Sequence, residues 1–417
     1  MGGKASLLLV LGFSSIFAIM GVEMLKSSNE ATDNYVKYFE QTEAHNLAVS
    51  GANMAANEIF INKFWMAGYS NLKIDEGSLD VTVDSIGVEN KLITAIGEYD
   101  GYQDTVIVLL APKNFAQYGN FYNSMGAWAA TGDTFSGPFH TNDYLKCYGD
   151  PVFLGYTTTQ NGVKLFHNDG TDNPEFHGGL QEGLFIPLEF DTSIIRQAAY
   201  DGGKIFYDTT GNNYIIDTKF VLNNDGTVDY SSNINNAGWS PVINEPLTTL
   251  APNGVIYVEK GNVLIEGTLN GQVSIVASTK GSTSAGMIHI TDDLRYNKNP
   301  LSDPTSTDML GLIAEKNVQV DFNLTTGNLD IHASMYSQQD GLIIEDYASY
   351  PTANNMNIIG GVIGQQVRAT ATYAWNGSAY VPTHGYSYVH KFDERFNKTV
   401  PPFFPKTKYY KVVTWLE

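Results

Sequence analysis

The sequence has few of the residues that bind nucleic acid or anionic surfaces. Charged residues make up only 16% of the chain, and 24 Lys and Arg stand against 44 Asp and Glu, giving a net charge of −20. A nucleic-acid interface needs clustered cations to neutralise phosphates, and the sequence has no such cluster. The same shortage argues against docking on anionic lipid. The acidic excess suits solubility outside the cell or weak Ca²⁺ binding, and we favour solubility.

Cysteine is almost absent, since Cys147 is the single one in 417 residues. One thiol cannot form an internal disulfide, and CxxC redox motifs and cysteine-based metal sites are excluded. The fold therefore depends on an apolar core and on hydrogen bonds. The cysteine count says nothing about the cellular compartment.

The loop that most resembles a calcium-binding loop lacks part of the required set of ligands. Asn223, Asp225 and Gly226 match part of an EF-hand loop, but Val221 and Ser232 stand where that loop needs carboxylates. We interpret the segment as a β-hairpin around an Asn-Asp-Gly turn. No cofactor is predicted, and structural Ca²⁺ has no matching motif.

Charge is absent from one long stretch, Ala5–Val22, near the start of the chain. As a helix it spans about 27 Å at about 1.5 Å per residue, close to the thickness of a bilayer core. It could be a cleaved signal peptide, a retained anchor or a polymerisation element. A cleaved signal has a shorter apolar region, a small-residue cleavage site and an extended mature start. Here a proline-free, helix-favouring sequence follows, so we predict one helix of roughly fifty residues or more and disfavour the cleaved signal.

Small residues recur at helical spacing in the second half of this helix. Such residues let another surface approach closely, which favours packing against copies of the chain. The sequence predicts a helix that is apolar in its first half and amphipathic in its second. Its predicted packing face consists of Ala44, Ala48, Ala52, Ala55 (or the adjacent Ala56) and Ile59.

The stretches ASLLLVLGFSSIFAIMG and YFEQTEAHNLAVSGANMAANEIF, followed by a β-rich sequence, resemble the stem of the type IV pilin superfamily. The likeness is greatest to pilin-like proteins with large heads, which TFSGPFHTNDYLKCYGDPVFLGY also resembles. In that superfamily the apolar half-helix anchors the subunit in the inner membrane and later packs against its copies in a filament core. The resemblance assigns this role to Leu7, Leu8, Leu9, Val10, Leu11, Phe13, Ile16, Phe17, Ile19 and Val22.

The resemblance also implies partners and a location. The partners are copies of the chain, a pilus assembly machinery and a prepilin peptidase, and the location is a cell-surface or extracellular filament. The superfamily usually carries a Glu at the fifth mature position, and neither Ala5 nor Leu8 supplies it. A minor or tip subunit therefore stays open.

Three strand-like segments follow the helix. SLDVTVDSI alternates apolar Leu79, Val81 and Val83 with polar residues, the period of a half-buried strand. KLITAIGEYDG and YQDTVIVLLAP come next, and the Asp-Gly pair between them predicts a hairpin turn. We expect a stem helix over 1–65 and a small antiparallel sheet over 66–112 that packs on its amphipathic half.

The remainder is predicted to be mostly β: a mixed region with a short helix over 113–250 and a head over 251–417. Short β-branched runs such as GVIYV and LGLIA recur between Gly and Asn corners, which indicates stacked strands of a β-solenoid. An antiparallel sandwich is the alternative. Residues from His390 onward are expected to cover a strand edge of the head. The predicted fold class is α+β, mostly β, with a long N-terminal helix, a small antiparallel sheet and a solenoid-like head.

Polar residues of the head form no recognisable active or metal site. Two groups are candidates: His140, Asn142, Asp143, His167 and His177, and further along Asp292, Asp293, Arg295, Asp330 and His332. The first group fits no zinc-site spacing, and we interpret it as hydrogen-bonded residues of turns. The second group holds the carboxylates and cations that a solenoid enzyme would need, but exposed Asp pairs are ordinary at strand corners.

The sequence thus predicts a non-enzymatic structural subunit of a type IV pilus-like filament, with no cofactor and no nucleic-acid partner. One alternative is a membrane-anchored surface protein or tip pilin with an adhesive head. A carbohydrate-active solenoid enzyme is less favoured. Adhesion and motility are not distinguished.

Overall fold

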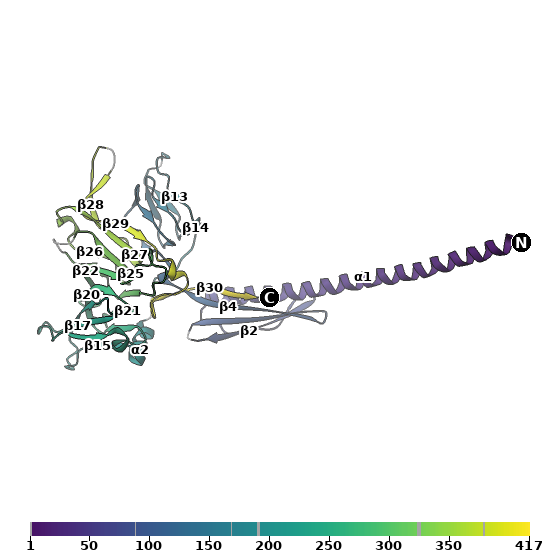
Figure 1. Ribbon diagram of the computed structural model, residues 1–417, viewed down its shortest axis with the longest axis horizontal. Coiled ribbons are helices and arrows are strands. Elements are labelled where there is room, and N and C mark those ends of the chain that lie inside the picture. Colours follow the sequence, from purple (N-terminus) through teal and green to yellow (C-terminus); the bar gives the residue numbers. More distant parts are fainter. Residues whose placement is uncertain (1, 88, 168, 190–191, 323–326, 378–379) are drawn as a thin grey trace. The chain divides into compact units, whose positions relative to one another are not determined.

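The computed structural model describes residues 2–87, 89–167, 169–189, 192–322, 327–377 and 380–417. The chain divides into two compact units, Met1–Pro112 with Tyr409–Glu417, and Lys113–Lys408. The first unit contains a long N-terminal helix and a small antiparallel sheet, and the second is a large β-rich head (Figure 1). The predicted fold class is confirmed in its long N-terminal helix, its small antiparallel sheet and its large β-rich head.

The first unit begins with α1 (Gly2–Ile61), a single uninterrupted helix of 60 residues. No proline occurs in it, so no backbone hydrogen bond of the helix interior is lost. By length and composition it is the one helix among the described residues that could cross a membrane. Figure 1 shows its first half extending beyond the small sheet of its own unit.

The small sheet pairs its first four strands antiparallel, each with its sequence neighbour. Tyr99 pairs with Tyr102, which leaves Asp100 and Gly101 as a two-residue turn with φ of 44° and 86°. This confirms the predicted hairpin, because only turns with positive φ match the twist of the flanking strands. The strand order is β1 (Tyr69–Ile74), β2 (Gly77–Ile86), β3 (Asn90–Tyr99), β4 (Tyr102–Asn114) and β30 (Lys406–Leu416).

The last strand differs from the sequence expectation. The segment after His390 was expected to cover a strand edge of the head, but β30 lies beside β4 in the small sheet. Tyr409–Glu417 accordingly belongs to the first unit. The ring of Tyr409 packs edge-on against Phe60 of α1, with centroids 5.0 Å apart. β-branched and aromatic residues in KTKYYKVVTWL favour a strand, but they do not indicate which sheet it joins.

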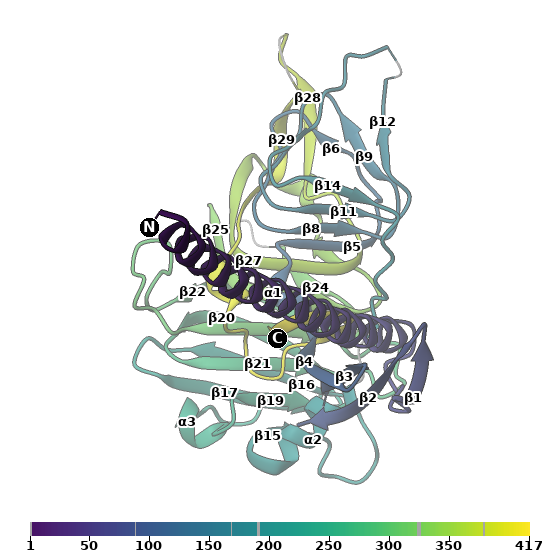
Figure 2. The ribbon, with the colours of Figure 1, turned by 90° about the vertical axis from the view of Figure 1, so that its right-hand side faces the viewer.

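In the second unit, short strands stack in parallel register, as Figure 2 shows for β5, β8, β11 and β14. Other strands of this unit consist of apolar runs, such as VIYV and MLGLIA, which are typical of parallel strands buried on both faces. One ladder runs β15 (Lys204–Phe206), β19 (Val255–Val258), β21 (Gln272–Ala277), β23 (Met309–Ala314), β25 (Leu329–Ser337), β27 (Ala353–Gln366), β5 (Asn120–Ser124), β8 (Phe139–Thr141), β11 (Thr157–Thr159), β14 (Leu180–Glu182).

A second parallel ladder lies beside the first, and two short ones accompany the N-terminal part of the head. Parallel pairing is the opposite of what a sandwich of antiparallel strands requires. A closed solenoid is not shown by the described residues, and that term stays a prediction. The second ladder is β16 (Ile216–Leu222), β20 (Gly261–Leu269), β22 (Ile288–Tyr296), β24 (Val318–Val320) and β26 (Leu342–Ile344); the short ones are β6 (Ala129–Ala130), β9 (Leu145–Tyr148), β12 (Val163–Leu165), and β7 (Thr134–Phe135), β10 (Val152–Phe153), β13 (Glu175–Phe176).

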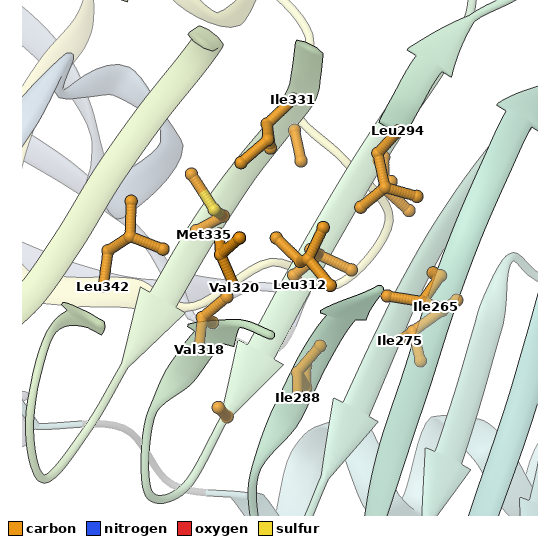
Figure 3. Packing of buried hydrophobic residues seen from close by; sticks show 14 of the residues in the cluster. Ile265, Ile275, Ile288, Leu294, Leu312, Val318, Val320, Ile331, Met335 and Leu342 are labelled. Carbon is orange, nitrogen blue, oxygen red and sulfur yellow. The ribbon is translucent and has the colours of Figure 1, made fainter. Parts of the chain in front are cut away.

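Aliphatic side chains from successive strands fill the space between the two main ladders. Figure 3 shows Ile265 and Ile288 from the second ladder gathered with Ile275 and Leu312 from the first. All four are fully buried. Each apolar side chain of this kind stabilises the fold by about 1.5–3 kcal/mol relative to exposure, so the stacked rungs form the core of the head.

The remaining elements of the head are additional to these ladders. β16 pairs antiparallel with β17, and Asp225 accepts hydrogen bonds from the Thr227 main chain and hydroxyl at 2.9 and 2.7 Å. This confirms the predicted hairpin in place of a calcium loop. These elements are β17 (Thr227–Ile234), β18 (Ile243–Pro246), β28 (Ala371–Trp375), β29 (Tyr380–Lys391), α2 (Thr192–Gly202), α3 (Leu247–Leu250), and the 3-10 turns Phe115–Gln117, Tyr347–Ser349 and Glu394–Asn397. The boundary predicted at residue 250 falls inside the single unit Lys113–Lys408.

Candidate functional site

The candidate site is the apolar half of α1. Every large apolar side chain from Leu7 to Leu25 is at least 53% exposed. The exposed side chains point to all sides of the helix, because they include the adjacent positions 7–11 as well as later ones. They contain the whole set predicted for the membrane or filament core: Leu7, Leu8, Leu9, Val10, Leu11, Phe13, Ile16, Phe17, Ile19 and Val22.

This exposure is too costly for a helix surrounded by water. Burying one such side chain is worth about 1.5–3 kcal/mol, so the segment leaves on the order of 20 kcal/mol unused. A whole domain is commonly stable by only about 5–15 kcal/mol. The apolar half of α1 therefore requires an apolar environment that the described residues of the chain do not provide.

The amphipathic half of α1 packs on the small sheet of its own unit. Ala48 and Ala52 are fully buried against Val81 and Ala95 of the sheet. The approach is close: a Cβ on Gly97 would lie 2.1 Å from the main-chain oxygen of Ala44. The whole predicted packing face, Ala44, Ala48, Ala52, Ala55 and Ile59, is buried with no exposed surface.

The small-residue face was also expected to favour contact with copies of the chain. That expectation is wrong for residues 44–59, because their own sheet already covers them. Helical spacing of alanines indicates that some surface approaches closely, but it does not say which one. The face thus fixes the stem to its sheet.

A second small-residue face lies in the apolar half. Ser14, Ala18 and Gly21 follow one another at spacings of four and three residues, so they share one side of the helix. A Cβ on Gly21 would meet nothing within 4 Å. Small residues at this spacing let two membrane helices approach closely. The spacing of these three residues is visible in the sequence, but the predicted packing face was placed on the more regularly spaced alanines of residues 44–55 instead.

Polar contacts of His45 join α1 to β4 and to Glu417. His45 Nδ1 lies 2.8 Å from Asp104 Oδ2 on β4, and the His45 Nε2 atom lies 3.9 Å from Glu417. Both pairs are part-exposed, and such pairs contribute about 0–1 kcal/mol each. The helix is therefore held mainly by its apolar face.

The polar groups considered for metal binding do not come together. His140 is buried, with Nδ1 2.7 Å from Thr158 Oγ1 and Nε2 2.8 Å from Asn142 Oδ1. Desolvation lowers the pKa of His140 to about 4. Its hydrogen bonds match the interpretation as a structural histidine. Asp143 instead accepts from the main chain of Tyr144, His167 contacts Asp172, and His177 contacts Glu175. Within the described ranges, no three potential ligands form a metal cluster.

The charged group on the head ladders is brought together, but as ion pairs. Arg295 lies 2.7 Å from both Asp293 and Asp330. Although desolvation acts in the opposite direction, hydrogen bonds from Asn357 and Arg295 hold the pKa of Asp330 below its usual value. Desolvation lowers the pKa of buried His332 to about 4, and its Nδ1 accepts from the main chain of Tyr296 at 3.0 Å. Asp292 accepts a hydrogen bond from the main chain of Asp293 at 2.8 Å, and its charge also acts on Arg295. The arrangement serves cross-strand pairing.

Comparison with known proteins finds distant similarity among solved structures. No protein-family model and no curated protein matches the sequence. Among solved structures, the chain is similar to the competence-associated pilin ComZ from Thermus thermophilus. The identity is 9% and the TM-score 0.40, over 90% of this chain and 97% of that one. At so low a similarity, function has to be derived from the residues of the chain itself.

Proposed function

We propose that the chain is a structural subunit of a type IV pilus-like surface filament that polymerises through α1. The observation that carries the proposal is the uncharged apolar half of α1, exposed on all sides and continuous with a half that is fixed to its own sheet. The first half is free for contacts outside the chain, and the second positions it rigidly.

The proposal gives the apolar half two successive environments. Before assembly it spans the inner membrane, since its uncharged stretch is about as long as a bilayer core is thick. In the filament it packs against copies of itself. Lipid already satisfies its apolar surface, so close packing at Ser14, Ala18 and Gly21 has to supply the attraction. The machinery and peptidase implied by the superfamily resemblance would act on this segment.

The alternative is a membrane-anchored surface protein that stays a monomer. The same uncharged length favours it, but a lone anchor needs no small-residue face. Catalysis is not part of the proposal, because the carboxylates considered for it are paired or exposed. Copies of the same chain are the proposed partners, and the head remains outside the membrane.

Cysteine cross-linking separates the two. Cys147 is the single cysteine and is buried, and desolvation together with the Asp172 charge raises its pKa to about 12. A cysteine placed in α1 is therefore the reactive thiol. In an Ala18→Cys variant, oxidation of sheared surface material is expected to give covalent dimers. Phe17→Cys, on another side of the helix, is the matched control and should cross-link less.

Electron cryo-microscopy of the same sheared material completes the test. Thin filaments with a helical core are expected for the parent chain. Monomers confined to the membrane fraction, without dimers at residue 18, would overturn the filament in favour of the anchor.

A further inference from the structure

The head contains a cavity of about 240 Å³, and the residues that line it are all distant from α1 along the chain. Its walls come from distant parts of the chain: the β5–β8 segment, the segment from β27 to β29, and Leu342 of β26. An apolar cavity of about 150 Å³ already admits a benzene molecule, so this one holds a small organic group. Six aromatic residues line it: Tyr122, Trp128, Phe135, Phe139, Tyr373 and Tyr388.

Four of the aromatic residues, Phe135, Phe139, Tyr122 and Tyr388, are held in place before any ligand arrives. Phe135 stacks on Phe153 at 4.9 Å and meets Phe139 edge-on at 5.2 Å. The hydroxyls of Tyr122 and Tyr388 both donate to Asn120 Oδ1, at 3.1 and 2.8 Å. Rings held in this way keep their faces available without further loss of conformational entropy.

One carboxylate in this cavity has no cationic partner. Asp133 Oδ2 accepts a hydrogen bond from the Ala130 main chain at 2.7 Å. Within the described part of the chain, no Lys, Arg or His forms an ion pair with Asp133. Desolvation raises the pKa of Asp133, and the hydrogen bond from Ala130 acts the other way. A cation in the cavity would remove this cost of holding a charge away from water.

The other charge at the cavity is already compensated. Arg368 donates from Nε and Nη2 to the two carboxylate oxygens of Asp340, at 2.8 and 2.9 Å. The cavity therefore presents aromatic faces and a net negative charge. Aromatic faces attract cations, and most strongly where water is excluded.

We propose that this cavity binds a small organic cation carrying an alkylated ammonium group, with Asp133 as counter-ion and the aromatic walls as its cage. A neutral sugar suits the cavity less well, because three of the four hydroxyls in its walls already donate within the protein. Tyr122 and Tyr388 donate to Asn120, and Thr370 donates to the main-chain oxygen of Tyr386 at 2.8 Å.

The probe is choline, titrated by calorimetry into the full chain in a non-ionic polyoxyethylene detergent. We expect a Kd on the order of 1 mM or tighter. Dimethylbutanol, the neutral isostere in which carbon replaces nitrogen, has the same shape without the charge. It should bind at least about tenfold more weakly, since cation–π attraction and the carboxylate both act on charge alone.

Two variants test the residues. Asp133→Asn keeps an oxygen that accepts from Ala130, and should weaken choline binding by about tenfold. Asp150→Asn, an exposed neighbour outside the cavity, is the matched control and should change nothing. Tyr373 is 53% exposed in the parent chain, so its removal costs little core packing. The Tyr373→Ala variant should therefore fold, and should bind choline severalfold more weakly.

Several results would overturn the proposal. These are equal binding of choline and its isostere, binding that Asp133→Asn and Tyr373→Ala leave unchanged, and no heat from choline. Saturable binding of glucose or maltose without choline binding would assign the cavity to sugars instead.

Discussion

At the scale of single residues, the head relies on buried histidines that remain neutral. His140, His332 and His390 are all at most 6% exposed. Desolvation lowers the pKa of each to about 4, against an ordinary value near 6.5. His390 is held by Asn120, which lies 3.4 Å from its Nδ1, and by the Gly360 main-chain oxygen, 3.1 Å from its Nε2. These side chains are structural, and their protonation opposes folding.

The stability of the head is therefore expected to fall with acidification between about pH 6.5 and pH 4. In this window the unfolded chain binds protons that the folded chain does not, so the contribution of these histidines to stability is complete above the window, decreases through it as the pH falls, and levels off below about pH 4. Each histidine contributes up to about 1.4 kcal/mol per pH unit. Denaturant titrations of the full chain in detergent, followed by near-UV circular dichroism across this range, measure the slope.

A single variant identifies the source of that slope. His140→Gln should lower the stability at neutral pH, because it loses packing, but it should also reduce the slope by about 1.4 kcal/mol per pH unit. His177→Gln, at an exposed position, should leave the slope as it is. Equal slopes in the parent and in His140→Gln would contradict the assignment.

At the scale of elements, the contact of α1 with β3 depends on a missing side chain. A Cβ on Gly97 would lie 2.1 Å from the Ala44 main-chain oxygen and 2.5 Å from the Ala48 nitrogen. Both atoms belong to a helix backbone that cannot move alone. We expect Gly97→Ala to destabilise the first unit by about 1–3 kcal/mol. The thermal transition of this unit, compared with that of Glu98→Ala at the next position, measures the loss.

Ala48→Leu tests the other side of the same contact. Because Ala48 is fully buried on the sheet, three added carbons have no space and should cost about 1–3 kcal/mol. Ala31→Leu on the exposed part of α1 is the matched control and should be nearly neutral. A stable Ala48→Leu chain that fails to form filaments would restore the earlier idea that this face meets other copies.

Sequence patterns were sufficient where the signal is local. The alternation at Leu79, Val81 and Val83 gave the correct strand, and the pairs Asp100-Gly101 and Asp225-Gly226 gave the correct hairpins. In each case neighbouring residues determine the geometry. The apolar run of α1 was equally clear, since charge is absent from it.

Patterns were insufficient where distant segments meet. β30 joins β4 across roughly three hundred residues, and no local feature of its sequence selects that partner. The cavity of the head went unnoticed for the same reason, because Asp133 and Tyr373 come from segments far apart. The alanine face of α1 was recognised and the sheet was expected on this half of the helix, but the alanines were assigned to contacts with copies of the chain rather than to the sheet.

At the scale of the whole molecule, the apolar half of α1 is separable from the folded part. Helix side chains from Leu7 to Tyr38 contribute nothing to the buried core, and burial begins near Ala44. A chain lacking residues 1–26 is therefore expected to be soluble without detergent, monomeric and folded in both units. Size-exclusion chromatography and circular dichroism check this.

Removal of residues 1–50 provides the contrast. It deletes Ala44 and Ala48, exposes the apolar face of the small sheet, and should unfold or aggregate the first unit. Aggregation of the shorter deletion as well would mean that the apolar run belongs to the core of the chain.

The pairing of β4 with β30 has a consequence for how such a chain can change over generations. Everything from Lys113 to Lys408 is inserted between two adjacent strands of one sheet. The two ends of the insertion are thus held at a fixed, short separation, whatever lies between them. A tight turn would join the same two strands, so an entire head can be added there, or one head exchanged for another, without altering the stem that holds it.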